Sequence, residues 1–367
     1  MEASALSGTG LRVRIACVGS RDQRISQNLR TYSIAPPLKG NLHYGLFPAF
    51  HRLRYLEITK RFRPKLVHYH LVMSTFFRPD YRAPAVLDVH DVFFLREEFY
   101  KRSLAPPPLF ASLLDKMEFA LTKGFDGVIA TSPSMANFIR RYFRGQISVV
   151  PNAVDVSNLR PGNDSNRPSE RFVVGSLGQT SKHLGFYEFA SAVAMLAHEL
   201  KELRAVWVGS VTQEAVRFVK RLGIEHVFSL PGFLPDELLG SQLATFDLGL
   251  SVRQRSTPKP ELSDYYQGTK TLALMACGVP VVVTPLMEQE RLVDVSGGGF
   301  ASSGFGSDAI SDAILRAYDS RQSLPGLGRS GRRYVETNHS AQSLTRALLG
   351  AYRNLVPSLG HEEPPDR

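Results

Sequence analysis

The run from Gln267 to Thr284, QGTKTLALMACGVPVVVT, restricts the fold of this chain more than any other stretch. Leu272 and Ala276 lie four positions apart in an apolar segment, which is the spacing of one helix face. Gly278 is typical of the position just after a helix, and Pro280 opens a run of β-branched residues. A turn, a short helix and a buried strand in this order predict a parallel α/β unit.

The start of this helix is a candidate phosphate site. A helix N-terminus presents free backbone N–H groups and a partial positive charge, so it can hold an anion. Gly268 opens the helix, and Lys270 with the hydroxyls of Thr269 and Thr271 would reinforce anion binding. An ordinary α/β unit with a surface lysine explains the same residues, so the local chemistry leaves both interpretations open.

The length and the composition set the class of protein. The chain has 367 residues, more than one hydrophobic core usually supports, so two domains are expected. Cys17 and Cys277 lie far apart, which fits buried thiols in a reducing compartment and predicts neither a disulfide framework nor a metal site. The start, MEASALSGTG, does not resemble a signal peptide, and no apolar run reaches the roughly 18–20 residues that span a bilayer. We therefore expect a cytoplasmic location.

Positive charge is concentrated in the first part of the chain. Residues 1–150 contain 22 of the 44 Lys and Arg and 11 of the 34 Asp and Glu, which leaves 22 basic and 23 acidic residues for the remainder. Such asymmetry suggests an anionic partner for the first part. The segment His51–Lys65 predicts a basic helix with Leu53, Leu56 and Phe62 toward the core. The basic face of this helix is either simply solvated or in peripheral contact with anionic lipid. No recognisable nucleic-acid-binding module is present, which argues against nucleic acid as the partner.

Two features of the first half lie where open α/β sheets place ligands, at the carboxyl ends of strands. The segment 11–19 predicts a first parallel strand that ends at Gly19, Ser20 and Arg21, a candidate acceptor-side turn. A second apolar strand, residues 85–90, ends at His90 and Asp91, and such a pair can serve acid–base or positioning roles. Arg21 also fits a solvated residue, and the His–Asp pair alone also fits a structural role, as do His68 and His70 on the preceding strand.

The segment KTLALMACGVPVVVT resembles the signature E-A-M-A-x-G-x-P-V-V of the retaining GT-B nucleotide-sugar glycosyltransferases of family 4. The resemblance covers most of the chain, from about Val67 to Tyr352. It implies the GT-B fold, in which two doubly wound Rossmann-like domains face a central cleft. We expect an acceptor-binding domain over residues 1–155, a linker over 156–171 and a nucleotide-sugar donor domain over 172–340. The last helix, residues 341–355, is expected to cross back onto the first domain.

The resemblance also implies roles for individual residues. His90 would orient the sugar, with Asp91 as its partner or as an acceptor contact. Lys182 matches a lysine that clamps the donor diphosphate, and Gly232 and Phe233 match a loop that contacts the nucleobase. The full set implied on the donor side is Gly178, Lys182, Gly232, Phe233, Gly268, Thr269, Lys270, Thr271 and Glu290. Transfer in this family requires no metal and no further cofactor, and the sequence shows no cluster of metal ligands.

The chain departs from the family pattern at three positions. The clamp arginine falls near Ser176, and the two glutamates of the Glu-x7-Glu pattern fall on Tyr265 and Ala273. These losses support an alternative, a degenerate GT-B protein that binds a nucleotide or a partner without catalysis. Another GT-B enzyme, such as a sugar epimerase, fits the order of motifs less well. The sequence does not identify the nucleotide, the sugar or the acceptor, and the oligomeric state is open.

Overall fold

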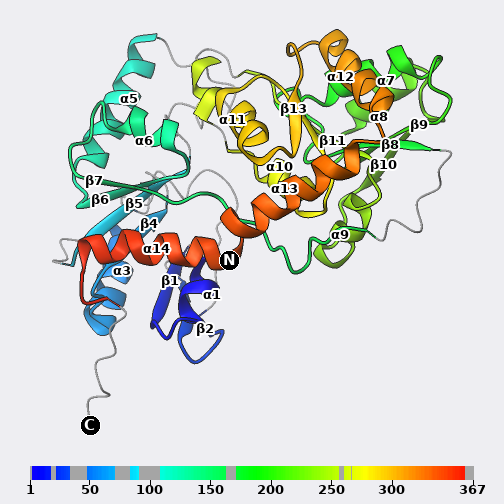
Figure 1. Cartoon of the computed structure of the whole chain (residues 1–367). Coiled ribbons are helices and arrows are strands. Elements are labelled where there is room, and N and C mark those ends of the chain that lie inside the picture. The colour runs from blue at the N-terminus through cyan, green and yellow to red at the C-terminus, as the bar shows by residue number, and fades with distance from the viewer. Residues whose placement is uncertain are drawn as a thin grey trace. The chain divides into compact units, whose positions relative to one another are not determined.

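The computed structural model describes residues 2–17, 22–33, 48–70, 83–90, 108–162, 171–255, 260–265 and 267–359 (Figure 1). The chain divides into two compact units. Unit 1 comprises Met1–Pro151 and Leu344–Arg367, and unit 2 comprises Asn152–Ser343. The first unit therefore ends at Pro151, a few residues before the expected position 155, because the segment that follows packs onto unit 2.

Unit 1 contains a four-stranded parallel sheet in the order β4-β5-β6-β7. β5 is buried along its whole length, as expected for a central strand of a parallel sheet. Helix α6 has a side-chain cap, since the Ser132 hydroxyl accepts a hydrogen bond from Met135 N at 3.1 Å and Pro133 starts the helix. The elements are β4 (Val67–His70), β5 (Ala85–Val89), β6 (Gly127–Ala130), β7 (Gln146–Val149), α3 (Pro48–Phe62), α5 (Pro108–Thr122), α6 (Pro133–Ile139) and α14 (Ala341–Leu355).

A second, smaller sheet forms at the N-terminus of unit 1. β1 (Val13–Cys17) pairs in parallel with β3 (Leu29–Ser33), and β2 (Gln23–Arg24) pairs with β3 in the antiparallel direction. Helix α1 (Glu2–Ser7) contacts β1 and β3. The strand predicted over residues 11–19 therefore exists, and in the described part of the chain it belongs to this small sheet and not to the four-stranded one.

Two helices of unit 1 test the amphipathic patterns. α14 joins unit 1 from Leu344 onward, where Leu355 packs against Gly127 of β6. α3 ends at Phe62, since Arg63 takes a left-handed backbone with φ 49°. Leu53 was expected to face the core, but its side chain is 66% exposed. The correction leaves an exposed leucine beside the basic residues of α3.

Unit 2 contains a six-stranded parallel sheet in the order β10-β9-β8-β11-β12-β13. With β8 counted as the first strand, this order reads 3-2-1-4-5-6, that of the doubly wound dinucleotide-binding fold. The strands are β8 (Phe172–Leu177), β9 (Leu203–Val208), β10 (Phe228–Gly232), β11 (Leu248–Ser251), β12 (Val281–Val283) and β13 (Gly299–Ala301). The helices are α7 (Phe186–Leu196), α8 (Gln213–Arg221), α9 (Asp236–Leu243), α10 (Thr269–Ala276), α11 (Met287–Ser296), α12 (Ser307–Asp319), α13 (Leu324–Asn338) and the short 3₁₀ helix Pro260–Tyr265.

Both faces of the unit 2 sheet are covered by apolar side chains. Val174 and Trp207 pack with the aromatic rings of α7 on one face. Val173, the neighbour of Val174 on β8, packs on the other face with Phe246 and Met275. Successive residues of a strand point to opposite faces, so a sheet with helices on both sides requires apolar residues at every position. This explains why the strands read as continuous apolar runs in the sequence.

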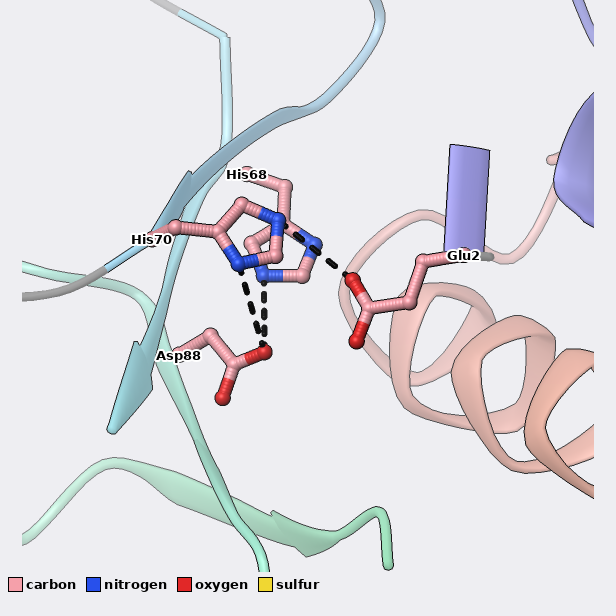
Figure 2. A group of neighbouring side chains, drawn as sticks. All are labelled: Glu2, His68, His70 and Asp88. Carbon is pink, nitrogen blue, oxygen red and sulfur yellow. Dashed lines mark ion pairs between the residues drawn. The ribbon is translucent and has the colours of Figure 1, made fainter. Parts of the chain in front are cut away.

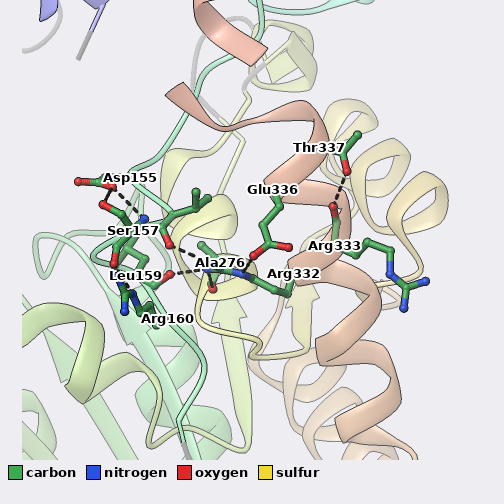
Figure 3. Close-up of polar contacts among 10 residues, drawn as sticks. Asp155, Ser157, Leu159, Arg160, Ala276, Arg332, Arg333, Glu336 and Thr337 are labelled. Carbon is green, nitrogen blue, oxygen red and sulfur yellow. Dashed lines mark hydrogen bonds and ion pairs between the residues drawn. The ribbon is translucent and has the colours of Figure 1, made fainter. Parts of the chain in front are cut away.

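The segment after the first unit is bound to unit 2 by Arg332 of α13 (Figure 3). The Arg332 guanidinium donates to the backbone carbonyls of Val156, Leu159 and Ala276. Its Nε also pairs with Glu336 at 2.6 Å. The expected linker, residues 156–171, is therefore packed against unit 2 over residues 156–162, and residues 163–170 lie outside the described part of the chain.

Candidate donor-binding edge

The strand order of unit 2 defines one edge as the place for a ligand. β8 and β11 are neighbours, and the chain winds away from them in opposite directions. Loops diverge at such a switch point, which leaves a crevice outside the carboxyl ends of the strands. The segments at this edge are residues 178–184 after β8, residues 252–255 after β11 and the start of α10.

The N-terminus of α10 is fixed in place and lacks a side-chain cap. Gly268 is the N-cap residue with extended backbone geometry, and as a glycine it has no side chain to cap the first turn. The preceding residue, Gln267, is held by Asn152, whose backbone N donates to Gln267 Oε1 at 2.7 Å and whose side chain donates to Gln267 O at 3.0 Å. Thr269 is exposed at this end. A rigid helix start whose first N–H groups have no partner within the helix suits an anion.

Lys270 lies inside the edge and not on its surface. Its ammonium donates to Val252 O at 2.9 Å and to Leu184 O at 3.4 Å, and it lies 5.5 Å from the centre of the Trp207 ring. Burial, followed by the charge of Arg253, lowers the pKa of Lys270 to about 7. Lys270 therefore joins the two loops that flank the switch point, and it brings a titratable positive charge to the base of the helix start.

Thr271 is engaged inside the unit. Its hydroxyl lies 2.6 Å from Ser251 Oγ and donates to Gln289 Oε1 at 2.7 Å, and the residue is fully buried. The sequence suggested that the Thr271 hydroxyl would reinforce a phosphate site. In the structure this hydroxyl already makes two hydrogen bonds inside unit 2, so it does not point toward a ligand. Its place in the first turn of α10 leaves the backbone N–H as its means of reaching an anion.

Gly178 and Lys182 lie on the loop after β8, and the structure explains the glycine. Gly178 has φ 127° and donates its N–H to Val208 O at 2.8 Å, while its carbonyl accepts from Trp207 Nε1 at 2.9 Å. A Cβ on the neighbouring Gly209 would lie 2.2 Å from Gly178 O, so both loops need glycine to approach this closely. Lys182 is exposed on the loop that carries Leu184, an acceptor of Lys270.

Sequence reasoning missed Arg253, the second residue after β11. Its backbone N donates to Thr284 Oγ1 at 3.0 Å, and that hydroxyl donates to Arg253 O at 2.7 Å. Its charge acts on Lys270. Ser176, the position matched to the missing clamp arginine, is fully buried within β8 and donates to Leu250 O at 2.7 Å. Positive charge at this edge therefore comes from Lys182, Arg253 and Lys270. The signal that could have indicated Arg253 in the sequence is its place as a basic residue just after the apolar strand β11.

The remaining donor-side residues lie farther along the same sheet. Gly232 ends β10 with φ 83° and accepts a hydrogen bond from Gly209 N at 2.8 Å. Phe233, which follows it, is 79% exposed. Glu290 is half-buried in the first turn of α11, where a carboxylate is favoured by the helix dipole. Phe233 is thus a large aromatic surface held out into solvent.

The two positions that match the family's glutamates carry no carboxylate. Ala273 lies in the apolar core of unit 2, and Tyr265 is half-buried at the end of the 3₁₀ helix. Asp264, the nearest carboxylate in the sequence, pairs with Arg255 at 3.3 Å and accepts a hydrogen bond from Met287 N at 3.4 Å. Asp264 is therefore occupied in supporting the start of α11.

Of the residues predicted in unit 1, only His90 lies in the described part of the chain. His90 Nε2 is 3.1 Å from Asp88 Oδ2. Asp91, Gly19, Ser20 and Arg21 lie outside the described residues, so the partner seen for His90 is Asp88. Burial is the strongest influence on Asp88 and raises its pKa, but the neighbouring rings of His68 and His90 outweigh it and hold the pKa well below its usual range.

A cavity of unit 2 lies at the other edge of the sheet. It has a volume of about 1110 Å³ and is lined by residues at the amino ends of strands, including Arg171, Arg204, Phe228 and Asp247. Ligands of doubly wound sheets bind at the carboxyl ends, so cavity size does not identify the donor edge. The identification rests on topology and on the helix start.

Comparisons with known proteins agree with this geometry. Residues 2–158 match the family model described as Glycosyltransferase Family 4, and residues 171–320 match the model described as Glycosyl transferases group 1. No curated protein sequence matches the chain significantly.

Solved structures resemble the chain over nearly its whole length. Sucrose-phosphate synthase from Thermosynechococcus elongatus is 18% identical, with a TM-score of 0.79, covering 97% of this chain and 92% of that one. HepE from Anabaena in complex with UDP-glucose is 18% identical with a TM-score of 0.67, covering 88% and 86%. WaaG, a glycosyltransferase of lipopolysaccharide biosynthesis, is 13% identical with a TM-score of 0.67, covering 95% and 93%. At these identities the likeness shows the GT-B fold.

Proposed function

Because the chain belongs to the GT-B glycosyltransferases of family 4, we propose that it transfers a glycosyl group from a nucleoside diphosphate sugar to an acceptor with retention of configuration. The observation that carries the proposal is the uncapped start of α10 at the switch point of the unit 2 sheet. Three basic residues, Lys182, Arg253 and Lys270, add positive charge to the same edge.

The chemistry follows from where charge develops. As the bond between the anomeric carbon and the diphosphate breaks, the leaving diphosphate gains negative charge. Groups already oriented toward that charge lower the barrier without reorganising. The N–H groups of Gly268, Thr269 and Lys270 would bind the phosphate oxygens directly. Lys182 would contact them from the loop after β8, and the buried ammonium of Lys270 would act through its charge. No step in this scheme needs a metal ion.

We propose uridine as the first nucleotide to test. Complexes of HepE contain UDP and UDP-glucose. The exposed ring of Phe233 next to Gly232 would supply a flat apolar surface for the base. Glu290 would contact the sugar from the start of α11. His90, held by Asp88, would position the transferred sugar from unit 1.

For the acceptor, we propose a phosphate-bearing or lipid-linked molecule bound by the basic first unit. The exposed side of α3 combines Leu53 with Lys60 and Arg61, and such a mixture suits peripheral contact with anionic lipid. Arg54 contributes less than the sequence indicates, because it pairs with Asp22 and Glu57. Within the described residues no helix has the length and apolar character to cross a membrane. Flotation with liposomes of increasing anionic lipid content tests this contact, and equal recovery on neutral liposomes would argue against it.

Thermal unfolding with a panel of nucleoside diphosphates and their sugar conjugates tests the donor site. A ligand at about 100 times its dissociation constant stabilises by about 2.7 kcal/mol, which raises the melting temperature by a few degrees. We expect one diphosphate to act and one of its sugar conjugates to act more strongly. Lys182→Ala should weaken this stabilisation about tenfold in ligand concentration, because a charged contact to phosphate contributes about 1.5 kcal/mol or more.

Lys201→Ala is the matched control, since Lys201 is also an exposed lysine of unit 2 but lies before β9. It should leave the ligand response unchanged. The panel also separates catalysis from binding alone: release of diphosphate from the stabilising conjugate, in the presence of an acceptor mixture, is expected of the enzyme. Stabilisation without any release would favour a protein that binds the nucleotide without transfer.

A further inference from the structure

The carboxyl ends of β4 and β5 in unit 1 carry a cluster of four ionisable side chains (Figure 2). In Figure 2 the two imidazole rings are stacked, and the two carboxylates approach their edges from different directions. The atoms that each residue offers as a ligand all lie within 4.8 Å of one another. The members of this cluster, called the histidine–carboxylate cluster below, are Glu2, His68, His70 and Asp88.

Strand geometry explains why these residues meet. His68 and His70 are two positions apart on β4, so both side chains leave the same face of the sheet. The register places His70 opposite Asp88 of β5, with both strands parallel. Glu2, the first residue of α1, approaches from the far end of the chain and lies 3.4 Å from His70 Nε2.

Two of the separations match those between neighbouring ligands of a bound ion. His68 Nε2 lies 3.4 Å from Asp88 Oδ2, and His70 Nε2 lies 3.4 Å from Glu2 Oε2. Zinc binds nitrogen and oxygen ligands at about 2.0–2.2 Å in a tetrahedron, so neighbouring ligands are about 3.3–3.6 Å apart. A hydrogen bond between imidazole and carboxylate is usually shorter, near 2.7–2.9 Å.

Polar atoms of the cluster lack hydrogen-bond partners among the described residues. These atoms are His68 Nε2 and Asp88 Oδ1, and both are buried. Asp88 is only 1% exposed. A buried polar atom without a partner is costly, and in native proteins it often marks an ion or a water.

The charges of the cluster also favour a cation. Burial and then the negative charge of Asp88 raise the pKa of Glu2. A divalent cation bound between the carboxylates of Glu2 and Asp88 would relieve this repulsion.

We propose that the histidine–carboxylate cluster of unit 1 binds one divalent ion of the zinc class. A set of two imidazoles and two carboxylates suits Zn²⁺ better than Mg²⁺ or Ca²⁺, which prefer oxygen ligands. With four protein ligands the site is closed, so its role is structural. The ion would tie α1 to the four-stranded sheet and would share Asp88 with His90. The proposal does not depend on the identity of the donor sugar.

Metal analysis and zinc titration of the full-length, tag-free chain test the proposal. We expect about one zinc per chain after purification without chelator, removed by a strong chelator and restored by Zn²⁺ alone. Replacement with Co²⁺ should give the visible absorption of a tetrahedral ion. Two variants should each weaken zinc binding tenfold or more: His70→Gln and Glu2→Gln. His70 is half exposed and Glu2 lies at the first helix, so neither change disturbs the core.

The matched controls are His198→Gln and Glu199→Gln, an exposed histidine and an exposed carboxylate of unit 2. They should bind zinc as the unchanged chain does. Zinc below a tenth of an equivalent with no cobalt absorption would overturn the proposal. So would equal zinc affinity in His70→Gln, since it would place the ion elsewhere. A melting temperature unchanged by zinc in the unmodified chain, despite stoichiometric binding, would reject the structural role.

Discussion

The two parallel sheets carry opposite charges at the carboxyl ends of their strands. In unit 2, Lys182, Arg253 and Lys270 lie near the start of α10. In unit 1, Asp88 lies among three histidines. Both sheets are parallel, so both edges are places where loops diverge. The two edges therefore share geometry and differ in the charge of the residues that follow the strands.

The difference concerns how each edge handles a buried charge. In unit 2 the ammonium of Lys270 is buried against two carbonyl groups and a tryptophan ring, and its pKa falls. In unit 1 the carboxylate of Asp88 is buried against imidazoles, and its pKa also falls. Burial destabilises the cation at the unit 2 edge, and an incoming anion would stabilise it. The unit 1 edge holds an anion, and an incoming cation would stabilise it.

The largest expected effect follows from removing the buried cation. Lys270→Met keeps the length of the side chain and deletes its charge, so turnover of the nucleotide sugar should fall about 10²-fold or more. The reason is the loss of a preorganised charge at the leaving diphosphate. Diphosphate release under saturating donor measures this. Lys220→Met, at an exposed position of α8, should turn over normally. Full activity in Lys270→Met would mean that the charge of Lys270 does not stabilise the leaving diphosphate.

The same substitution sharpens the comparison through pH. Lys270 has a pKa of about 7 in the folded chain, against an ordinary value of 10.5. Between these values the unfolded chain binds more protons than the folded one, so the stability of the unchanged protein rises with pH. The free energy of unfolding of the unchanged protein, relative to that of Lys270→Met, should rise by about 1.4 kcal/mol per pH unit above pH 7 and should not change with pH below it. Urea unfolding of both proteins at pH 6, 7, 8 and 9 measures the difference. Parallel stability curves would show that Val252 and Leu184 carbonyls solvate the ammonium fully.

Much of unit 2 could be predicted because its signals are local. The helix Thr269–Ala276 and the strand Val281–Val283 follow from apolar spacing, a glycine after the helix and a β-branched run. The spacing of apolar residues did not predict which way the polar side chains of this helix point. Lys270 and Thr271 point inward because Val252, Ser251 and Gln289 offer acceptors there, and those partners come from β11 and α11.

The unit 1 edge was harder to predict because its residues are distant in the sequence. The spacing His68-x-His70 and Asp88-x-His90 already shows two polar residues per strand on one face. Their meeting depends on the register of β4 and β5, which a single sequence does not state. Glu2 adds a contact across more than sixty residues, from a helix with no motif of its own. The expectation of no metal-ligand cluster rested on local spacing alone.

The smallest expected effect concerns the support of the proposed cation site. Tyr352 of α14 places its hydroxyl 2.6 Å from His68 Nδ1. When His68 Nε2 binds an ion, Nδ1 carries the proton and donates to the Tyr352 oxygen, which fixes the ring orientation. Tyr352→Phe keeps the packed ring and removes only this acceptor, so zinc affinity should fall about tenfold. Zinc titration against a competing chelator measures it, with Tyr318→Phe in unit 2 as the matched control. Unchanged affinity would mean that packing alone orients the His68 ring and that the cation site does not depend on the Tyr352 hydroxyl.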